Sequence, residues 1–133
     1  MRTFAASSRA EPAAAWRLLA RPDLWSRWSP HVRGAWRLGA PEVRQGAVGA
    51  ARLHGVVPVP ARIVGKHPGR SWTWQIGFGL VEIVHRVEAR PEGGATVAVD
   101  VIAPEPLERA LAMTCGPIIE RSLERLARRA ERS

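Results

Sequence analysis

The sequence predicts an α+β fold in which one face of a seven-stranded antiparallel sheet is covered by a long C-terminal helix. Three observations lead to this prediction. Two short helical segments follow a first strand, and apolar and polar residues then alternate with period two between residues 35 and 103, as in half-buried antiparallel strands. Residues 105–132 carry apolar side chains at three- and four-residue spacing. A half-buried sheet needs a covering layer, and this last segment has the apolar stripe to provide it.

The first elements are set by the placement of proline. Residues 2–9 form the first predicted strand, and a helix opens at Pro12 because proline is favourable in a first helical turn. The helix runs to Ala20, where Pro22 interrupts it and starts a second, shorter helical segment over residues 24–28. The chain is therefore expected to place two short helices directly after its first strand.

Six further strands are predicted, separated by turns rich in glycine and proline. They cover residues 35–39, 47–54, 56–66, 71–76, 81–90 and 95–103. Pro58 and Pro60 each lack a donor for a strand ladder, so we expect the strand that contains them to begin near Ala61 or to lie bulged at an edge.

The hairpin over residues 70–88 carries the most informative pattern. A four-residue loop at Gly77–Leu80 pairs Ile76 with Val81, Trp74 with Ile83, and Trp72 with His85, all on the apolar face. His85 is the one titratable residue on that face, and burial beside an indole is expected to lower its pKa. His85 is thus a candidate for a ligand contact, although a core histidine paired with a backbone carbonyl or water would show the same pattern.

The next turn decides whether His85 has a carboxylate partner. A three-residue loop at Pro91–Gly93 places Val99 opposite His85, with Asp100 on the outer face near Arg86. A four-residue loop would pair His85 with Asp100 but would expose three valines, each worth roughly 1.5–3 kcal/mol when buried. The first register is therefore favoured, and no His–Asp dyad is expected.

The terminal segment, residues 105–132, is predicted to be one amphipathic helix. Its apolar stripe consists of Leu107, Leu111, Thr114, Ile118, Ile119, Leu123, Leu126 and Ala130. Pro117 removes one helical hydrogen bond, and because Gly116 precedes it we expect a kink there.

Four short motifs occur in an order that matches a known family. They are AWRLLARPDLWSRWSP at residues 15–30, HRVEA at 85–89, GGAT at 93–96 and GPIIE at 116–120. With them the whole chain, 1–133, resembles a single domain of the START-like (SRPBCC) superfamily, in particular its polyketide cyclase/dehydrase and lipid-transport group. The resemblance implies a helix-grip fold, with the sheet curved around the terminal helix and a hydrophobic cavity between them.

This resemblance leads to a predicted binding site for a small hydrophobic or aromatic molecule of polyketide, lipid or quinone type. The expected ligand-binding residues are Trp72, Trp74, Ile83, His85, Val99, Leu111, Thr114, Cys115, Ile118 and Trp28. Trp25 and Trp28 share a helix face, and they either cap the open end of the cavity or only attach the short helix to the sheet. Arg62 faces either the ligand or, in the simpler interpretation, the solvent.

Two other functions stay open at this point. In the first, the protein is a cyclase or dehydratase in which His85 transfers a proton. The absence of tyrosine weakens this interpretation, because many aromatic-polyketide cyclases use phenolic side chains. In the second, it is an interaction module on ribosomes or chaperones, which other members of the superfamily are.

Composition excludes several other classes. The net charge is +8, but the arginines are dispersed and no run of five like charges occurs, so nucleic-acid binding is not favoured. The single cysteine, Cys115, excludes an internal disulfide, and no histidine pair has metal-ligand spacing. No nucleotide-binding glycine motif and no apolar run of about 20 residues is present. We therefore expect a cytoplasmic protein without metal, cofactor or membrane span, whose homodimerisation stays open.

Overall fold

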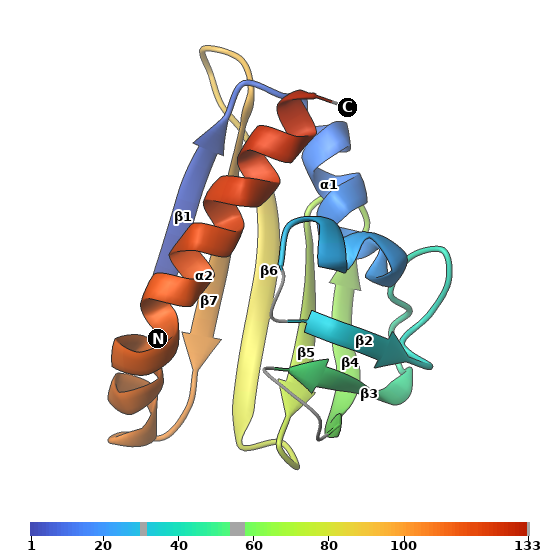
Figure 1. Ribbon diagram of the computed structural model, residues 1–133, viewed down its shortest axis with the longest axis vertical. Helices are drawn as coiled ribbons and strands as arrows, with labels where there is room; N and C mark the ends of the chain where they lie inside the picture. The colour runs from blue at the N-terminus through green and yellow to red at the C-terminus, as the bar shows by residue number, and fades with distance from the viewer. Residues whose placement is uncertain (30–31, 54–57, 133) are drawn as a thin grey trace.

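The computed structural model describes residues 1–29, 32–53 and 58–132 and confirms the predicted α+β architecture. Within these ranges the elements are β1 (Arg2–Ser8), α1 (Pro12–Ala20), the 3-10 helix η1 (Pro22–Arg27), β2 (Val32–Trp36), β3 (Val48–Leu53), β4 (Pro58–His67), β5 (Ser71–Ile76), β6 (Val81–Ala89), β7 (Ala95–Ile102) and α2 (Leu107–Glu131). The seven described strands form one antiparallel sheet in the order β1-β7-β6-β5-β4-β3-β2. In Figure 1 the sheet curves around α2, with α1 beside the upper end of that helix and η1 below α1.

The strand predicted at residues 35–39 lies three residues earlier, at Val32–Trp36. Arg37 has a φ of 62° and Gly39 a φ of 123°, so the backbone turns directly after Trp36. Left-handed backbone cannot continue a strand ladder. Alternation alone does not show this turn, because an arginine at positive φ leaves no mark in the apolar pattern.

The prediction that β4 begins near Ala61 was wrong, since the strand begins at Pro58. Pro58 and Pro60 pair with β3, whereas β5 pairs with β4 only from Ala61 onward. The Pro60 carbonyl accepts a hydrogen bond from the Gly77 amide, 3.3 Å away, just beyond the end of β5. The nitrogen atoms of both prolines therefore point to the β5 side of β4, beyond the end of β5. The β3–β4 ladder loses no hydrogen bond to them.

Both hairpin registers were predicted correctly. Trp72 lies opposite His85, and His85 lies opposite Val99. Asp100 is on the outer face of the sheet, where its carboxylate accepts hydrogen bonds from Arg86 at 2.8 and 3.0 Å and from the Thr3 hydroxyl at 2.7 Å. The guanidinium of Arg86 holds the pKa of Asp100 below its ordinary value, so this carboxylate serves the outer face and not His85.

Three indoles donate to the last turn of α1, two from η1 and the residue after it and one from β5. Trp25 and Trp72 both donate to the Leu19 carbonyl, at 2.9 and 3.0 Å, and Trp28 donates to the Leu18 carbonyl at 2.9 Å. These carbonyls lie in the last turn of α1, where helical carbonyls lack partners within the helix. The indoles therefore complete the hydrogen bonding of α1 and fix its end against β5.

Helix α2 is attached to the sheet along β1. Gly116 packs against the Phe4 ring so closely that a Cβ added there would lie 3.0 Å from a ring carbon. Near the other end, the Ser8 hydroxyl donates to the Ala127 carbonyl at 2.8 Å. The helix continues through Pro117 from Leu107 to Glu131. With one side held on β1, α2 leaves its other side facing a space above β5–β7.

Candidate functional site

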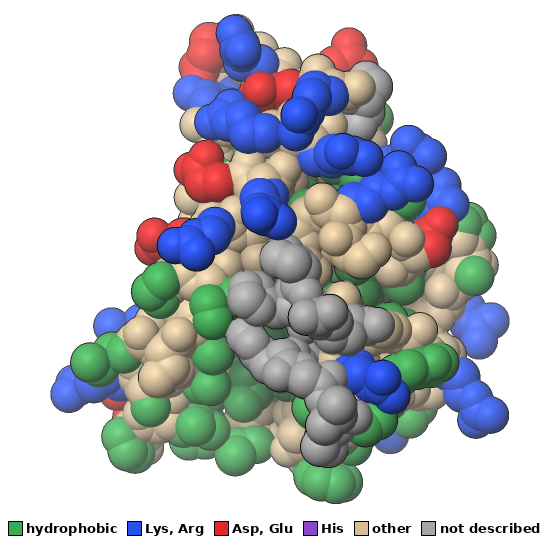
Figure 2. Space-filling model, viewed as in Figure 1, with side chains coloured by type: hydrophobic (Ala, Val, Ile, Leu, Met, Phe, Trp, Pro, Cys, Tyr) green, Lys and Arg blue, Asp and Glu red, His purple; other side chains and the backbone are tan. Residues whose placement is uncertain are grey.

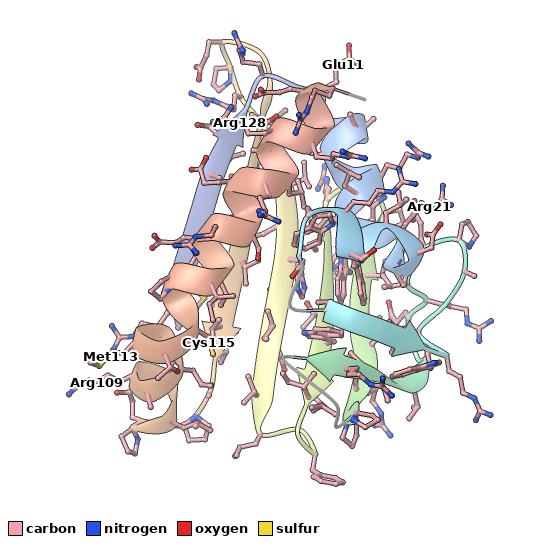
Figure 3. The ribbon with its side chains drawn as sticks, in the orientation of Figure 1. Glu11, Arg21, Arg109, Met113, Cys115 and Arg128 are labelled. Atoms are coloured by element: carbon pink, nitrogen blue, oxygen red, sulfur yellow. The ribbon has the colours of Figure 1, made fainter. Side chains whose placement is uncertain are left out.

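A cavity of about 230 Å³ lies between the sheet and α2 and is partly open to solvent. Nine of the ten residues predicted as ligand contacts line it: Trp28, Trp72, Trp74, Ile83, His85, Val99, Leu111, Cys115 and Ile118. In Figure 3, Cys115 lies on the side of α2 that faces the sheet, whereas Arg109 and Met113 point away from it. The structure thus brings together side chains from β5, β6, β7, η1 and α2 around one space.

Thr114 is the predicted contact that does not reach the cavity. Its side chain is exposed, and its hydroxyl donates to the Ala110 carbonyl at 2.8 Å. At 3.6 residues per turn, Thr114 lies roughly 100° around the helix from the centre of the lining face that includes Leu111, Cys115 and Ile118. The predicted apolar stripe was therefore drawn too wide at this position.

Trp25, for which the sequence analysis left a place at the cavity open, also lines it. The lining residues that the sequence analysis did not assign are Ser29, Val32, Ile76, Val81, Val101, Ile119, Ser122 and Leu123. Most continue a pattern that was already visible, either strand alternation or the helical stripe. Ser29 and Val32 do not, because they border the connection after η1, where no periodic pattern exists.

An aromatic cluster forms one wall of the cavity. His85 stacks on Trp72 with ring centroids 3.8 Å apart, and Trp72 stacks on Trp25 at 5.3 Å. Trp74 stands edge-on to all three rings at 5.3–5.7 Å. Stacked and edge-to-face rings are arrangements that aromatic quadrupoles favour, so the four rings stabilise one another in this wall.

Two buried nitrogen atoms of this wall have no hydrogen-bond partner among the described residues. They are Nε1 of Trp74 and Nδ1 of His85. A buried donor or acceptor without a partner costs about 1–3 kcal/mol, and such atoms in native proteins call for an explanation. Both atoms are buried inside the wall and present no surface to the cavity.

Burial sets the protonation state of His85. It lowers the pKa of this imidazole from 6.5 to about 3, outweighing the opposing influence of the Trp72 backbone and the Asp100 carboxylate. The ring is therefore neutral at physiological pH. An efficient general base has a pKa near the working pH and is oriented by a partner. His85 meets neither condition, since Asp100 is engaged by Arg86 on the outer face.

The remaining candidates lie away from the cavity. Arg62 is exposed on β4, and Trp36 is partly exposed with the Arg52 guanidinium 5.3 Å above its ring. His67 is exposed, whereas His31 and His54 fall outside the described residues. Among the residues described, no group of three His, Cys, Asp or Glu side chains could hold a metal ion. The described helices include none that is long and apolar enough to span a membrane.

Comparison with known proteins places the chain in a family. A family model described as polyketide cyclase / dehydrase and lipid transport matches residues 1–131. The chain belongs to this family. A comparison with curated protein sequences found no match to this chain.

Solved structures resemble this polyketide cyclase/dehydrase and lipid-transport family member in fold. Protein MLL2253 from Mesorhizobium loti has a TM-score of 0.77 at 13% identity, over 99% of this chain and 98% of its own. Ara h 8.0201 has a TM-score of 0.69 at 16% identity, over 99% of both chains. DynU16, from the dynemicin biosynthetic locus, has a TM-score of 0.72 at 17% identity, over 97% of this chain and 46% of its own. At these identities the likeness shows the fold alone.

Proposed function

We propose that this protein binds a small hydrophobic molecule, of polyketide, lipid or quinone type, in the cavity between the sheet and α2. The observation that carries the proposal is a cavity of about 230 Å³ with a wall of stacked aromatic rings and few polar groups. Ligand pockets in proteins have this character, being mostly apolar with a small number of placed polar groups. Membership of the polyketide cyclase/dehydrase and lipid-transport family supports the same class of ligand.

Native mass spectrometry of the purified protein tests the proposal directly, through the mass of a co-purified molecule. A matched pair of variants then places that molecule. Cys115→Phe adds a ring inside the cavity. Thr114→Phe adds the same ring one residue earlier, on the exposed face of α2. We expect Cys115→Phe to weaken binding at least tenfold, or about 1.4 kcal/mol, and Thr114→Phe to leave it unchanged. Equal affinities in both variants would place the ligand elsewhere.

The alternative role of a cyclase or dehydratase has weaker support. A histidine whose pKa is about 3 is neutral and a poor proton acceptor, and no carboxylate orients it. Under the enzyme hypothesis, His85→Ala abolishes turnover of a polyketide substrate while affinity persists. Under our proposal, the same change lowers affinity and no turnover is lost.

A groove lined by arginines supports a second candidate function, docking on a ribosome or chaperone. Its lining residues are Arg27 of η1 and Arg121, Glu124, Arg125, Arg128, Arg129 and Arg132 of α2. Figure 2 shows basic side chains gathered over the upper part of this face, with hydrophobic ones below. A surface of this kind attracts acidic or phosphorylated partners through salt-sensitive contacts.

Affinity capture from a lysate at low and high salt tests this second candidate. If it is correct, the bound ribosomal or chaperone fraction falls steeply with salt and is lost in Arg121→Glu/Arg125→Glu. The control is Arg62→Glu/Arg70→Glu, which carries the same charge change on exposed positions of β4 and a loop. If this control captures as much as the wild type, the groove has a specific role. If both double variants lose capture alike, only net charge matters and the candidate fails.

A further inference from the structure

We propose that the outer face of β2, β3 and β4 binds single-stranded nucleic acid, with a base stacked on Trp36 and backbone phosphates held by Arg52 and Arg62. These strands form one end of the sheet, and their outer face is turned away from the core and the cavity. The inference therefore goes beyond the proposed function and does not depend on it. It draws on the register of the three strands, the exposure of one indole, and the charge of the face.

The register places Trp36 and Arg52 on the same face of the sheet. Ala51 of β3 is fully buried in the core, so its neighbours Ala50 and Arg52 point to the outer face. Trp36 of β2 is paired with Ala50 and therefore points the same way. The guanidinium of Arg52 lies 5.3 Å from the centroid of the Trp36 ring, within the range of a cation–π contact.

Arg62 of β4 lies on the same face, further along the strands. It is paired with Val48, whose side chain is exposed on β3. At about 3.3 Å per residue, the register separates Arg62 from Arg52 by about 13 Å along the strands, with Trp36 at a level between them. A strand with stacked bases rises about 3.4 Å per nucleotide, so this distance corresponds to about four nucleotides.

Trp36 is the exposed tryptophan of this protein. Its exposed fraction is 43%, whereas the other five tryptophans are at most 7% exposed. The indole packs over the backbone of Gly34, where an added Cβ would lie 3.2 Å from two of its ring carbons. Exposed indoles and guanidinium groups are the surfaces on which the bases of single strands stack. Trp36 and Arg52 together therefore offer a stacking platform.

The charge of the face favours an anionic partner. The described strands β2, β3 and β4 contain no Asp or Glu. Glu42, between β2 and β3, is engaged by Lys66 at 3.0 Å and by the indole of Trp16 at 3.1 Å. Among the described residues, no carboxylate pairs with Arg52 or Arg62. A polyanion can therefore contact both guanidinium groups without displacing an ion pair.

Both arginines can reach a partner in solution. Arg62 is exposed. Arg52 is half-buried, but Nε is the one nitrogen of its guanidinium that is buried without a partner, so the two terminal nitrogens remain at the surface. The sequence shows no run of like charges, and only the pairing of the strands brings these two arginines beside an exposed indole.

Two other occupants fit this face less well. In an isologous dimer the same patch meets itself, so a second copy of the chain would bring the arginines of one face against those of the other. An acidic protein segment offers carboxylates at some positions, whereas a single strand carries a phosphate and a flat base in every nucleotide. The combination of an indole with two unpaired guanidinium groups therefore favours the nucleic acid.

The test compares two labelled probes with the same phosphates. One is oligo(dT) of about eight nucleotides, within the range of single-strand site sizes, and the other is an abasic oligomer of the same length. Fluorescence anisotropy at low salt gives both affinities. We expect the wild type to bind oligo(dT) at least about fivefold more tightly, which is the smallest ratio expected for one stacked base. Equal affinities would show that only phosphates are attracted and would overturn the inference.

Matched variants locate the stacking contact. Trp36→Leu should remove the preference for oligo(dT) over the abasic oligomer. Phe78→Leu, which removes the 94% exposed ring of the loop between β5 and β6, should keep that preference. If Trp36→Leu keeps the preference, or if both variants lose it, the base does not stack on Trp36 and the inference is wrong.

A second pair of variants locates the phosphate contact. Arg62→Gln should weaken both probes and lower the slope of log affinity against log salt by about 0.7, the value for one contact on a single strand. Arg109→Gln removes the same charge from an exposed position on α2 that points away from the sheet, and should leave the slope unchanged (Figure 3). Equal changes in both variants would show that only net charge matters and would overturn the inference.

Competition identifies the kind of partner. Poly(Glu) and phosphatidylserine vesicles, at the same concentration of charge, should displace labelled oligo(dT) at least about fivefold less effectively than unlabelled oligo(dT), because neither supplies a base for Trp36. Displacement by either competitor as effective as that by oligo(dT) would assign this face to an acidic protein or a membrane instead, and the inference would be wrong.

Discussion

Mild acid is expected to destabilise this protein through His85. In the unfolded chain a histidine binds a proton with a pKa near 6.5, whereas in the folded protein burial lowers the pKa of His85 to about 3. Below pH 6.5 the unfolded state therefore binds more protons than the folded state, and acid favours unfolding. This contribution to stability is complete above pH 6.5 and is lost progressively as the pH falls toward 3.

The magnitude follows from the width of this window. The slope reaches about 1.4 kcal/mol per pH unit well inside the window, but at pH 6.5 an unfolded histidine is only about half protonated. The drop from pH 6.5 to pH 4.5 therefore costs about 2.3 kcal/mol of unfolding free energy. Ion pairs also lose strength as the pH falls. Arg86 lowers the pKa of Asp100, and the N-terminal amine lowers the pKa of Glu108, so both carboxylates contribute stability that acid removes; a control variant that keeps both is therefore needed.

Urea unfolding followed by tryptophan fluorescence at pH 6.5 and 4.5 provides the assay, with His85→Phe as the control. Phenylalanine keeps an aromatic ring against Trp72 but cannot titrate. The other histidines are present in both proteins, so their contribution cancels in the difference. We expect the wild type to lose about 2.3 kcal/mol more than His85→Phe between these pH values. If the two proteins lose the same amount, His85 is not held neutral by burial and the electrostatic description of the cavity is wrong.

Two further predictions concern the fold that supports the cavity. Gly93→Ala and Gly94→Ala both place a side chain at positive φ, but only in Gly94→Ala does the new Cβ meet the Ser8 carbonyl oxygen. Thermal unfolding should therefore show a loss of about 1–2 kcal/mol for Gly93→Ala and a clearly larger loss for Gly94→Ala, and similar losses would contradict the close approach of β1 to this turn. Asp100→Ala leaves Arg86 without its main partner and should cost about 2 kcal/mol of stability without changing ligand affinity. A matching loss of affinity would instead indicate that Asp100 acts on the cavity.

The strand registers could be predicted from the sequence because side-chain alternation leaves only one choice that buries every apolar residue. The position of Val99 opposite His85 followed from keeping three valines inside. Helical periodicity likewise placed Leu111 and Ile118 on the face of α2 that lines the cavity. Thr114 was misplaced because a methyl-bearing side chain at the edge of the stripe can bond to its own helix and face the solvent.

Other features of the site depend on tertiary contacts that leave no pattern in the sequence. The sequence around Trp72 and Trp74 does not show that the Trp72 indole donates to the Leu19 carbonyl, whereas the Trp74 indole has no acceptor among the described residues. That difference arises where the end of α1 approaches β5. The cavity volume likewise depends on the distance between α2 and the sheet. The close contact between Gly116 and Phe4 helps to set that distance.

The central claim is that the space between the sheet and α2 binds a small apolar molecule. Titrations of ¹⁵N-labelled protein with 1-indanone, pyrene and palmitate, followed by backbone amide shifts, test it most directly. The claim predicts saturable shifts at cavity positions such as His85, Val99 and Cys115, with Arg62 and Thr114 unaffected. Shifts that never saturate, or that fall on the outer face of the sheet and leave the cavity residues unchanged, would contradict it.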